Sequence, residues 1–215
     1  AGATQSVFTM YRLPTAFPAA GSAYPENFPR PRTLFKDPGN TATGGATSGP
    51  ASIADGQIPG VTTRRDAHGM VSTIQGHYVH NVDRIQNNVR SYNTADGTSA
   101  EYSLVNGACA AVAVTDDAGL PADDPAPDLM DRSPNGDFLF YAGRGPTPVT
   151  VTHSAQGSCP GAGVIQLTDG GASGFLKGVL RTSNTVDTAP HSTPGGHAYT
   201  GAERSDPHGV SVVIK

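Results

Sequence analysis

Two stretches of the chain decide its fold, because one repeats the other. They are Asp66-Ala-His-Gly-Met-Val-Ser-Thr-Ile-Gln-Gly-His-Tyr-Val-His-Asn-Val-Asp-Arg84 and Ala126-Pro-Asp-Leu-Met-Asp-Arg-Ser-Pro-Asn-Gly-Asp-Phe-Leu-Phe-Tyr-Ala-Gly-Arg144. The two align without gaps at an offset of 60 residues, which places Gly76 on Gly136. Each copy reads as a strand, a tight turn whose glycine supplies a positive φ, and a second strand. The repeat therefore predicts the same β-hairpin used twice.

A third copy starts at Asp206-Pro-His-Gly-Val-Ser-Val-Val213, 140 residues after the first. Each complete hairpin is also followed by a strand, an Asp-Gly turn and another strand: 88–104 after the first copy and 162–180 after the second. Four antiparallel strands in this order are typical of a propeller blade.

We therefore predict one all-β domain over 1–215, a β-propeller of four-stranded antiparallel blades with long Gly/Pro-rich loops. Its parts are a partial blade at 1–60, blades at 61–105 and 126–181, and the start of a further blade at 205–215. A propeller usually has about 4–8 blades. This length therefore leaves three alternatives: insertions that displace further strands, a ring closed by pairing chains, or a part of a longer protein.

Composition agrees with short strands and turns. The 215 residues include 27 Gly and 18 Pro, and only 15% are charged. The net charge of −4 comes without a basic patch, so we expect no nucleic-acid partner. We also expect no membrane span, because apolar runs stay short of about 18 residues. The small residues Ala1-Gly2-Ala3-Thr4 are typical of a chain whose signal peptide has been removed.

The repeat motifs resemble bacterial β-propellers of the YVTN type, related to the haem-binding propeller of nitrite reductase and to nitrous oxide reductase. The resemblance rests on four segments: Arg65-Asp-Ala-His-Gly69, His80-Asn-Val-Asp-Arg84, Ser133-Pro-Asn-Gly-Asp137 and Ser205-Asp-Pro-His-Gly209. It implies the propeller fold over about residues 60–215. It carries over no haem or copper ligand, because no ligand motif of the family matches here.

The two cysteines, Cys109 and Cys159, both lie in Gly-rich loops. One disulfide in an oxidising compartment fits this pattern, and two unpaired thiols are the alternative. Together with the small N-terminal residues, the pair favours a secreted or periplasmic bacterial protein.

Histidine and aspartate recur at the start of the repeated inner strand. His68 and His208 occupy equivalent positions, each two residues after an aspartate (Asp66 and Asp206), and Asp128 takes the histidine position in the middle copy. Inner strands line a propeller's channel, so these residues are candidates for a divalent metal site, for Ca²⁺ or a transition metal. The alternative is that they only hold turns and neighbouring strands together.

Other polar residues have simpler interpretations. His80 aligns with Phe140 and is expected to be packed, whereas Arg84 and Arg144 are expected to form salt bridges or to bind carbonyl groups between blades. A loop contains Asp116, Asp117, Asp123 and Asp124. It could bind Ca²⁺ but lacks the EF-hand spacing, so we expect a solvated acidic loop.

These patterns predict a secreted, non-catalytic propeller. It would bind a protein partner or associate with itself through loops 37–65, 106–127 and 182–204, since long loops on a β scaffold are common binding sites. The alternative is a metal-dependent oxidoreductase or hydrolase with its ion near His68 and His208. A carbohydrate-binding module fits less well, because the chain has no Trp for stacking.

Overall fold

The two repeated hairpins form matching pairs of strands in the computed structural model. The structure describes residues 9–12, 32–36, 67–84, 86–114, 121–146, 156–182, 191–192, 198–199 and 205–213. The turns form as the sequence predicts, with φ of 70° at Gly76 and 80° at Gly136. In each turn the glycine N–H donates to the carbonyl of the residue three positions earlier, Thr73 or Ser133. A side chain at either glycine would be strained, which explains why both copies carry it.

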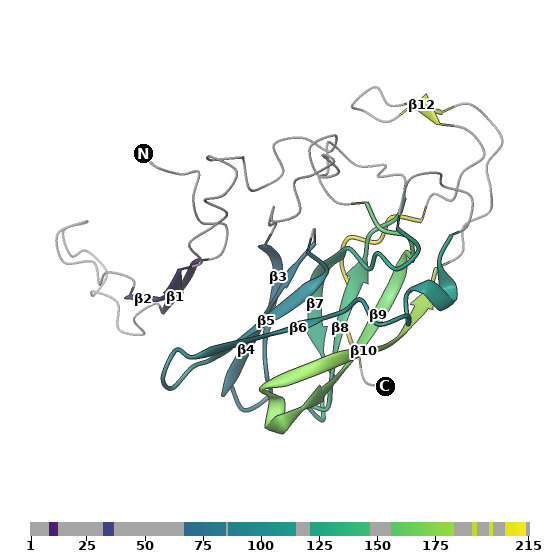
Figure 1. The fold of residues 1–215 in the computed structure, drawn as a ribbon. Helices are drawn as coiled ribbons and strands as arrows, with labels where there is room; N and C mark the ends of the chain where they lie inside the picture. Colours follow the sequence, from purple (N-terminus) through teal and green to yellow (C-terminus); the bar gives the residue numbers. More distant parts are fainter. Residues whose placement is uncertain are drawn as a thin grey trace, which may run out of the picture.

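The first four-stranded antiparallel sheet has the order β3-β4-β5-β6, and the second has the order β7-β8-β9-β10 (Figure 1). In the first sheet, the strands are β3 (Ala67–Ser72), β4 (Tyr78–Asp83), β5 (Asn88–Asn93) and β6 (Ser99–Ser103). In the second, they are β7 (Pro127–Arg132), β8 (Phe138–Gly143), β9 (Gly161–Thr168) and β10 (Ser173–Arg181). The fold is thus all-β and built from blade-type sheets, as an incomplete propeller requires.

The two inner hairpins also share an irregularity in strand pairing. The register shifts between Ala67 and Met70 in the first sheet and between Pro127 and Met130 in the second. A shift at this point bends the strand and redirects its first side chains. His68 and Asp128 both lie inside the shifted segment, which therefore sets the direction of both candidate ligands.

The sheets pack face to face, with β3 beside β7 at one edge and β6 beside β10 at the other (Figure 1). The core between them comes from both sheets and consists of Val82, Val89, Tyr102, Leu104, Leu139, Tyr141, Ile165 and Leu176. Burial of each large apolar side chain contributes about 1.5–3 kcal/mol. This shared core fixes the inner edges of the two sheets next to each other.

A disulfide between Cys109 and Cys159, predicted as one of two alternatives, is present in the structure. Both residues are fully buried and belong to the core between the sheets. The bond ties the segment after β6, which contains the 3-10 helix η2 (Ala110–Val112), to the segment before β9. The disulfide therefore links the segment that leaves the first sheet to the second sheet.

The remaining described elements are short. They are the antiparallel pairs β1 (Thr9–Arg12) with β2 (Arg32–Lys36) and β11 (His191–Ser192) with β12 (Ala198–Tyr199), and the 3-10 turn η3 (Asp169–Gly171). Ser205–Val213 has no strand assignment. Loop 37–65 and most of 182–204 lie outside the described residues. In the part of the chain that is described, there is no helix long and apolar enough to cross a membrane.

Reduction of the disulfide should destabilise the protein. The bond closes a loop with a sequence separation of 50 residues. In the chain-entropy description, opening such a loop lowers the free energy of unfolding by about 4 kcal/mol. Urea unfolding followed by circular dichroism, with and without dithiothreitol, measures this change. A Cys109→Ala/Cys159→Ala variant is the control and should not respond to the reductant. Equal stability of the oxidised and reduced wild type would contradict the expectation.

Candidate functional site

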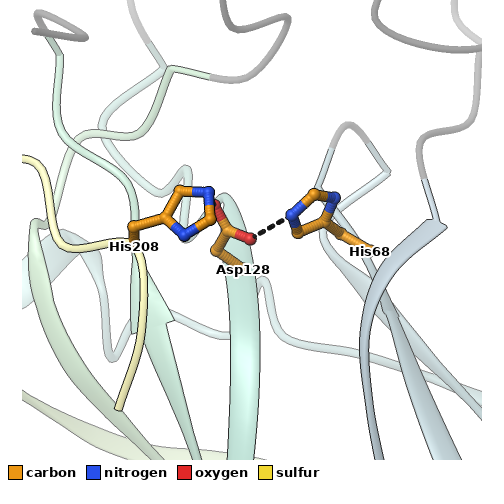
Figure 2. A group of neighbouring side chains, drawn as sticks. All are labelled: His68, Asp128 and His208. Carbon is orange, nitrogen blue, oxygen red and sulfur yellow. Dashed lines mark ion pairs between the residues drawn. The ribbon is translucent and has the colours of Figure 1, made fainter. Parts of the chain in front are cut away.

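Three inner segments place equivalent residues side by side. His68 comes from β3, Asp128 from β7, and His208 from the segment Ser205–Val213 (Figure 2). The two imidazoles lie on opposite sides of the Asp128 carboxylate. One ligand atom of each residue lies within 4.8 Å of the others. The convergence predicted from the repeat is thus present for these three residues.

The individual distances differ across the group. His68 Nε2 lies 2.8 Å from Asp128 Oδ1, and His208 Nε2 lies 3.7 Å from Asp128 Oδ2. The two histidine rings stand edge to face, with centroids 5.7 Å apart. The Asp128 side chain is fully buried, whereas His68 is 28% and His208 47% exposed. The group therefore has a buried carboxylate and two imidazoles that reach solvent.

Two buried arginines hold the other side of the Asp128 carboxylate. Arg144 Nη1 lies 2.9 Å and Arg84 Nη1 lies 3.4 Å from Oδ2. Burial raises the pKa of Asp128, but the contact with His68 and the charges of His68, Arg84 and Arg144 outweigh burial and lower it. Asp128 is thus a carboxylate at neutral pH. The expected salt bridges are confirmed: Arg84, which follows β4 of the first sheet, pairs with Asp128 of the second sheet, and Arg144 pairs with Asp206 of the segment Ser205–Val213.

Glycine after histidine allows the inner strands to approach. A Cβ added to Gly69 would lie 2.2 Å from the Asp128 carbonyl oxygen and 2.9 Å from Leu129 Cα. Both contacts are with backbone, which cannot move aside as a side chain can. The His-Gly dipeptide therefore combines a candidate ligand with the close approach that brings Asp128 beside it.

Asp206, the aspartate that precedes His208, is not part of this group of described residues. Asp206 accepts hydrogen bonds from Arg144 Nη2 at 2.5 Å and from the Gly145 N–H at 3.1 Å. The Asp206 carboxylate therefore binds Arg144 and Gly145 of the second blade and does not contribute to the group of three. Asp66 lies outside the described residues.

The residue types of the group suit a divalent ion, and side-chain rotation would be needed to hold it. A zinc ion bonds histidine nitrogen and carboxylate oxygen at about 2.0–2.2 Å, so its ligand atoms lie about 3.3–3.6 Å apart. His68 Nε2 lies 2.8 Å from Asp128 Oδ1 and His208 Nε2 lies 3.7 Å from Oδ2, and one ligand atom of each residue lies within 4.8 Å of the others, so the side chains must rotate to share one ion. The buried oxygen Asp128 Oδ1 is contacted by His68 Nε2 at 2.8 Å. That oxygen retains lone pairs for a cation beside His68.

His80 is a packed histidine, as its alignment with Phe140 predicts. Its side chain is fully buried. Nε2 lies 2.9 Å from the Gly171 carbonyl oxygen and Nδ1 lies 3.0 Å from the Tyr102 hydroxyl. Since a carbonyl only accepts, Nε2 carries the proton and Nδ1 accepts from Tyr102. Burial lowers the pKa of His80 to about 4, so the ring is neutral and joins the two sheets.

The prediction of a solvated acidic loop is wrong for Asp124. This side chain is buried and accepts a hydrogen bond of 2.6 Å from Asn87 Nδ2. Burial, with help from the charge of Asp123, raises the pKa of Asp124 to about 7. Asp116 and Asp117 lie outside the described residues. The composition of a loop shows that it is acidic, but it does not show which of its carboxyl groups is buried in the fold.

Replacing Asp124 by Asn should change how stability depends on pH. The folded-state pKa of about 7 lies above the ordinary value of 3.8. Between these values the folded chain keeps a proton that the unfolded chain has released. Wild-type stability should therefore fall as pH rises from about 4 to 7, by up to about 1.4 kcal/mol per pH unit.

The Asp124→Asn variant lacks this loss, so its stability relative to wild type should increase from pH 4 to pH 8. Urea unfolding at both pH values measures the difference, with pH 4 as the internal reference because both side chains are then neutral in the folded state. The same difference at both pH values would show that Asp124 is not responsible.

Comparison with known proteins leaves the family open. No protein-family model and no curated protein matches the chain. A crystal structure of a protein from Lactobacillus plantarum aligns at 13% identity and a TM-score of 0.37, covering 66% of this chain and 42% of that one. A candidate 6-phosphogluconolactonase from Bacteroides fragilis NCTC 9343 aligns at 14% identity and a TM-score of 0.37, covering 71% and 43%.

A second candidate 6-phosphogluconolactonase, from Bacteroides uniformis ATCC 8492, aligns at 13% identity and a TM-score of 0.27, covering 68% of this chain and 55% of that one. The chain spans less than half the length of the first two proteins. Similarities of this size carry no conclusion about activity. The blade architecture rests on the strand order and packing of the chain itself.

Proposed function

We propose that this chain is a secreted, non-catalytic β-propeller module that binds a divalent transition-metal ion through His68, Asp128 and His208. The observation that carries the proposal is the convergence of one ligand atom from each of these residues within 4.8 Å. The three come from sequence positions 60 and 80 residues apart. An ion there would join three successive inner segments.

The ligand chemistry favours a transition metal over Ca²⁺. Imidazole nitrogen suits Zn²⁺, Cu²⁺, Fe²⁺ and Ni²⁺, whereas Ca²⁺ takes six to eight oxygen ligands. The charges favour the same choice. Arg84 and Arg144 balance Asp128 and Asp206, so the site with neutral histidines has no excess negative charge to attract a hard cation. Affinity must then come mainly from the imidazole lone pairs, which a transition metal uses.

The arginines also have a role in the proposed site. They hold Asp128 Oδ2, so Oδ1 is left on the side of His68. Partners that orient a metal ligand in this way typically change metal affinity about 10–100-fold. In the competing role the group binds no metal, and a protonated His68 forms an ion pair with Asp128 that holds the two inner strands together. A proton and a metal ion compete for the same nitrogen, so the two states exclude each other at His68.

Metal-dependent catalysis, as an oxidoreductase or hydrolase, is the second candidate. It is favoured by the exposure of His68 and His208, 28% and 47%, in a group of three candidate ligands among the described residues. Catalytic zinc sites have three protein ligands and keep a further position for water or substrate. The Co²⁺-substituted protein tests this candidate. Visible bands that shift on adding azide or cyanide would show an exchangeable position, and unchanged bands would remove the candidate.

Export and assembly complete the proposal. The buried disulfide is compatible with an oxidising compartment, since such bonds are rare in reducing cytosol. Assembly with a protein partner or a second copy would use loops 37–65, 106–127 and 182–204 together with exposed sheet edges, which readily pair. Kinship with YVTN-type propellers remains a prediction from the repeat motifs.

Zinc binding measures the proposed function. Titration of EDTA-treated protein with Zn²⁺ in a calorimeter should give one ion per chain. Outer partners of a metal ligand already change affinity about 10–100-fold, so His68→Ala or His208→Ala should weaken binding by at least about tenfold. The matched control is His77→Ala, which removes an exposed histidine of the same hairpin. Binding that survives both ligand substitutions, or its absence in the wild type, would overturn the proposal.

A further inference from the structure

The segment Ser205–Val213 lies against the second sheet but has no strand assignment. Two of its contacts run through aspartate side chains near its ends. Asp206 is bound by Arg144 and the Gly145 N–H, and the Val212 N–H donates to Asp131 Oδ2 at 2.8 Å. His208 lies between these two attachment points.

Gly145 determines how closely the segment can dock. A Cβ added to Gly145 would lie 1.9 Å from the Ser205 carbonyl oxygen and 3.0 Å from its carbonyl carbon. Real Cβ atoms do not come this close to backbone, so any larger residue must push the segment away. The docked position of His208 therefore depends on a glycine that belongs to the second blade and carries no ligand atom.

The contact between His208 and Asp128 is longer than a hydrogen bond. Nε2 lies 3.7 Å from Oδ2, whereas N–H···O bonds span about 2.7–3.2 Å. The His208 side chain is also 47% exposed. A metal ion bonded to both residues would replace this long contact with two short bonds and would connect the segment to a fully buried carboxylate.

We infer that metal binding and docking of Ser205–Val213 are coupled, because one ion would connect this segment to both four-stranded sheets. The inference rests on the proposed function, because it assigns the ion to the same three residues. Linkage makes the effect reciprocal: if docking raises zinc affinity by some factor, zinc raises the docking equilibrium by the same factor. Such coupling typically amounts to about 5–150-fold.

Hydrogen–deuterium exchange with mass spectrometry tests the coupling on the full chain. Peptides covering 205–213 are followed in EDTA and in excess Zn²⁺. We expect zinc to slow exchange of these amides by about 5–150-fold. In Gly145→Ala the segment should exchange quickly in EDTA, and zinc affinity should fall by a comparable factor.

Two further variants keep the test independent of one substitution. Gly178→Ala is the matched control, because its Cβ would meet nothing within 4 Å, and it should behave like wild type. Asp206→Asn preserves side-chain shape but removes the charge that Arg144 binds, so it should weaken docking and zinc affinity together.

The outcomes separate the inference from the proposed function. Absence of zinc binding in the wild type would overturn both. Stoichiometric binding that requires His68, with no protection of 205–213 and no effect of Gly145→Ala, would overturn the coupling and leave the metal site in place. Protection by zinc in wild type and Gly178→Ala, with weakened zinc binding in Gly145→Ala, would support both.

Discussion

The buried carboxylate of Asp128 is the constraint on which the arrangement of the blades depends. A buried charge must be paired, and removing one partner of a buried ion pair typically costs about 3–5 kcal/mol. Arg84 of the first sheet and Arg144 of the second both reach Oδ2. Arg144 also binds Asp206 of the following segment. Satisfying these charges requires the starts of three inner segments to lie together, so the ion pairs set the register between blades.

This requirement also explains why equivalent positions carry different residues. The repeat places His68, Asp128 and His208 in the same position of successive copies. One carboxylate between two arginines is neutralised, whereas three carboxylates there would repel one another. Histidines on either side add ring nitrogens without adding negative charge. A cluster that stabilises the propeller is thus also chemically suited to a transition metal.

Much of the fold could be predicted from sequence because local chemistry determined it. Gly76 and Gly136 mark turns that need positive φ, and the 60-residue offset reproduces even the pairing irregularity of β3 and β7. The pairing of Arg84 and Arg144 followed from their equivalence. Asp124 was misread because its burial depends on Asn87, which is distant in sequence. The close approaches at Gly69 and Gly145 also involve distant backbone, which spacing does not reveal.

X-ray absorption at the zinc edge of the Zn²⁺-loaded protein tests most directly whether His68 and His208 share one ion. Nitrogen and oxygen atoms are expected at about 2.0–2.2 Å from the zinc ion, with more distant scattering from two imidazole rings. In His208→Ala the imidazole scattering should fall to that of one ring. A spectrum with one imidazole or none in the wild type would contradict the convergence of the two sheets and the segment Ser205–Val213 on a single metal ion.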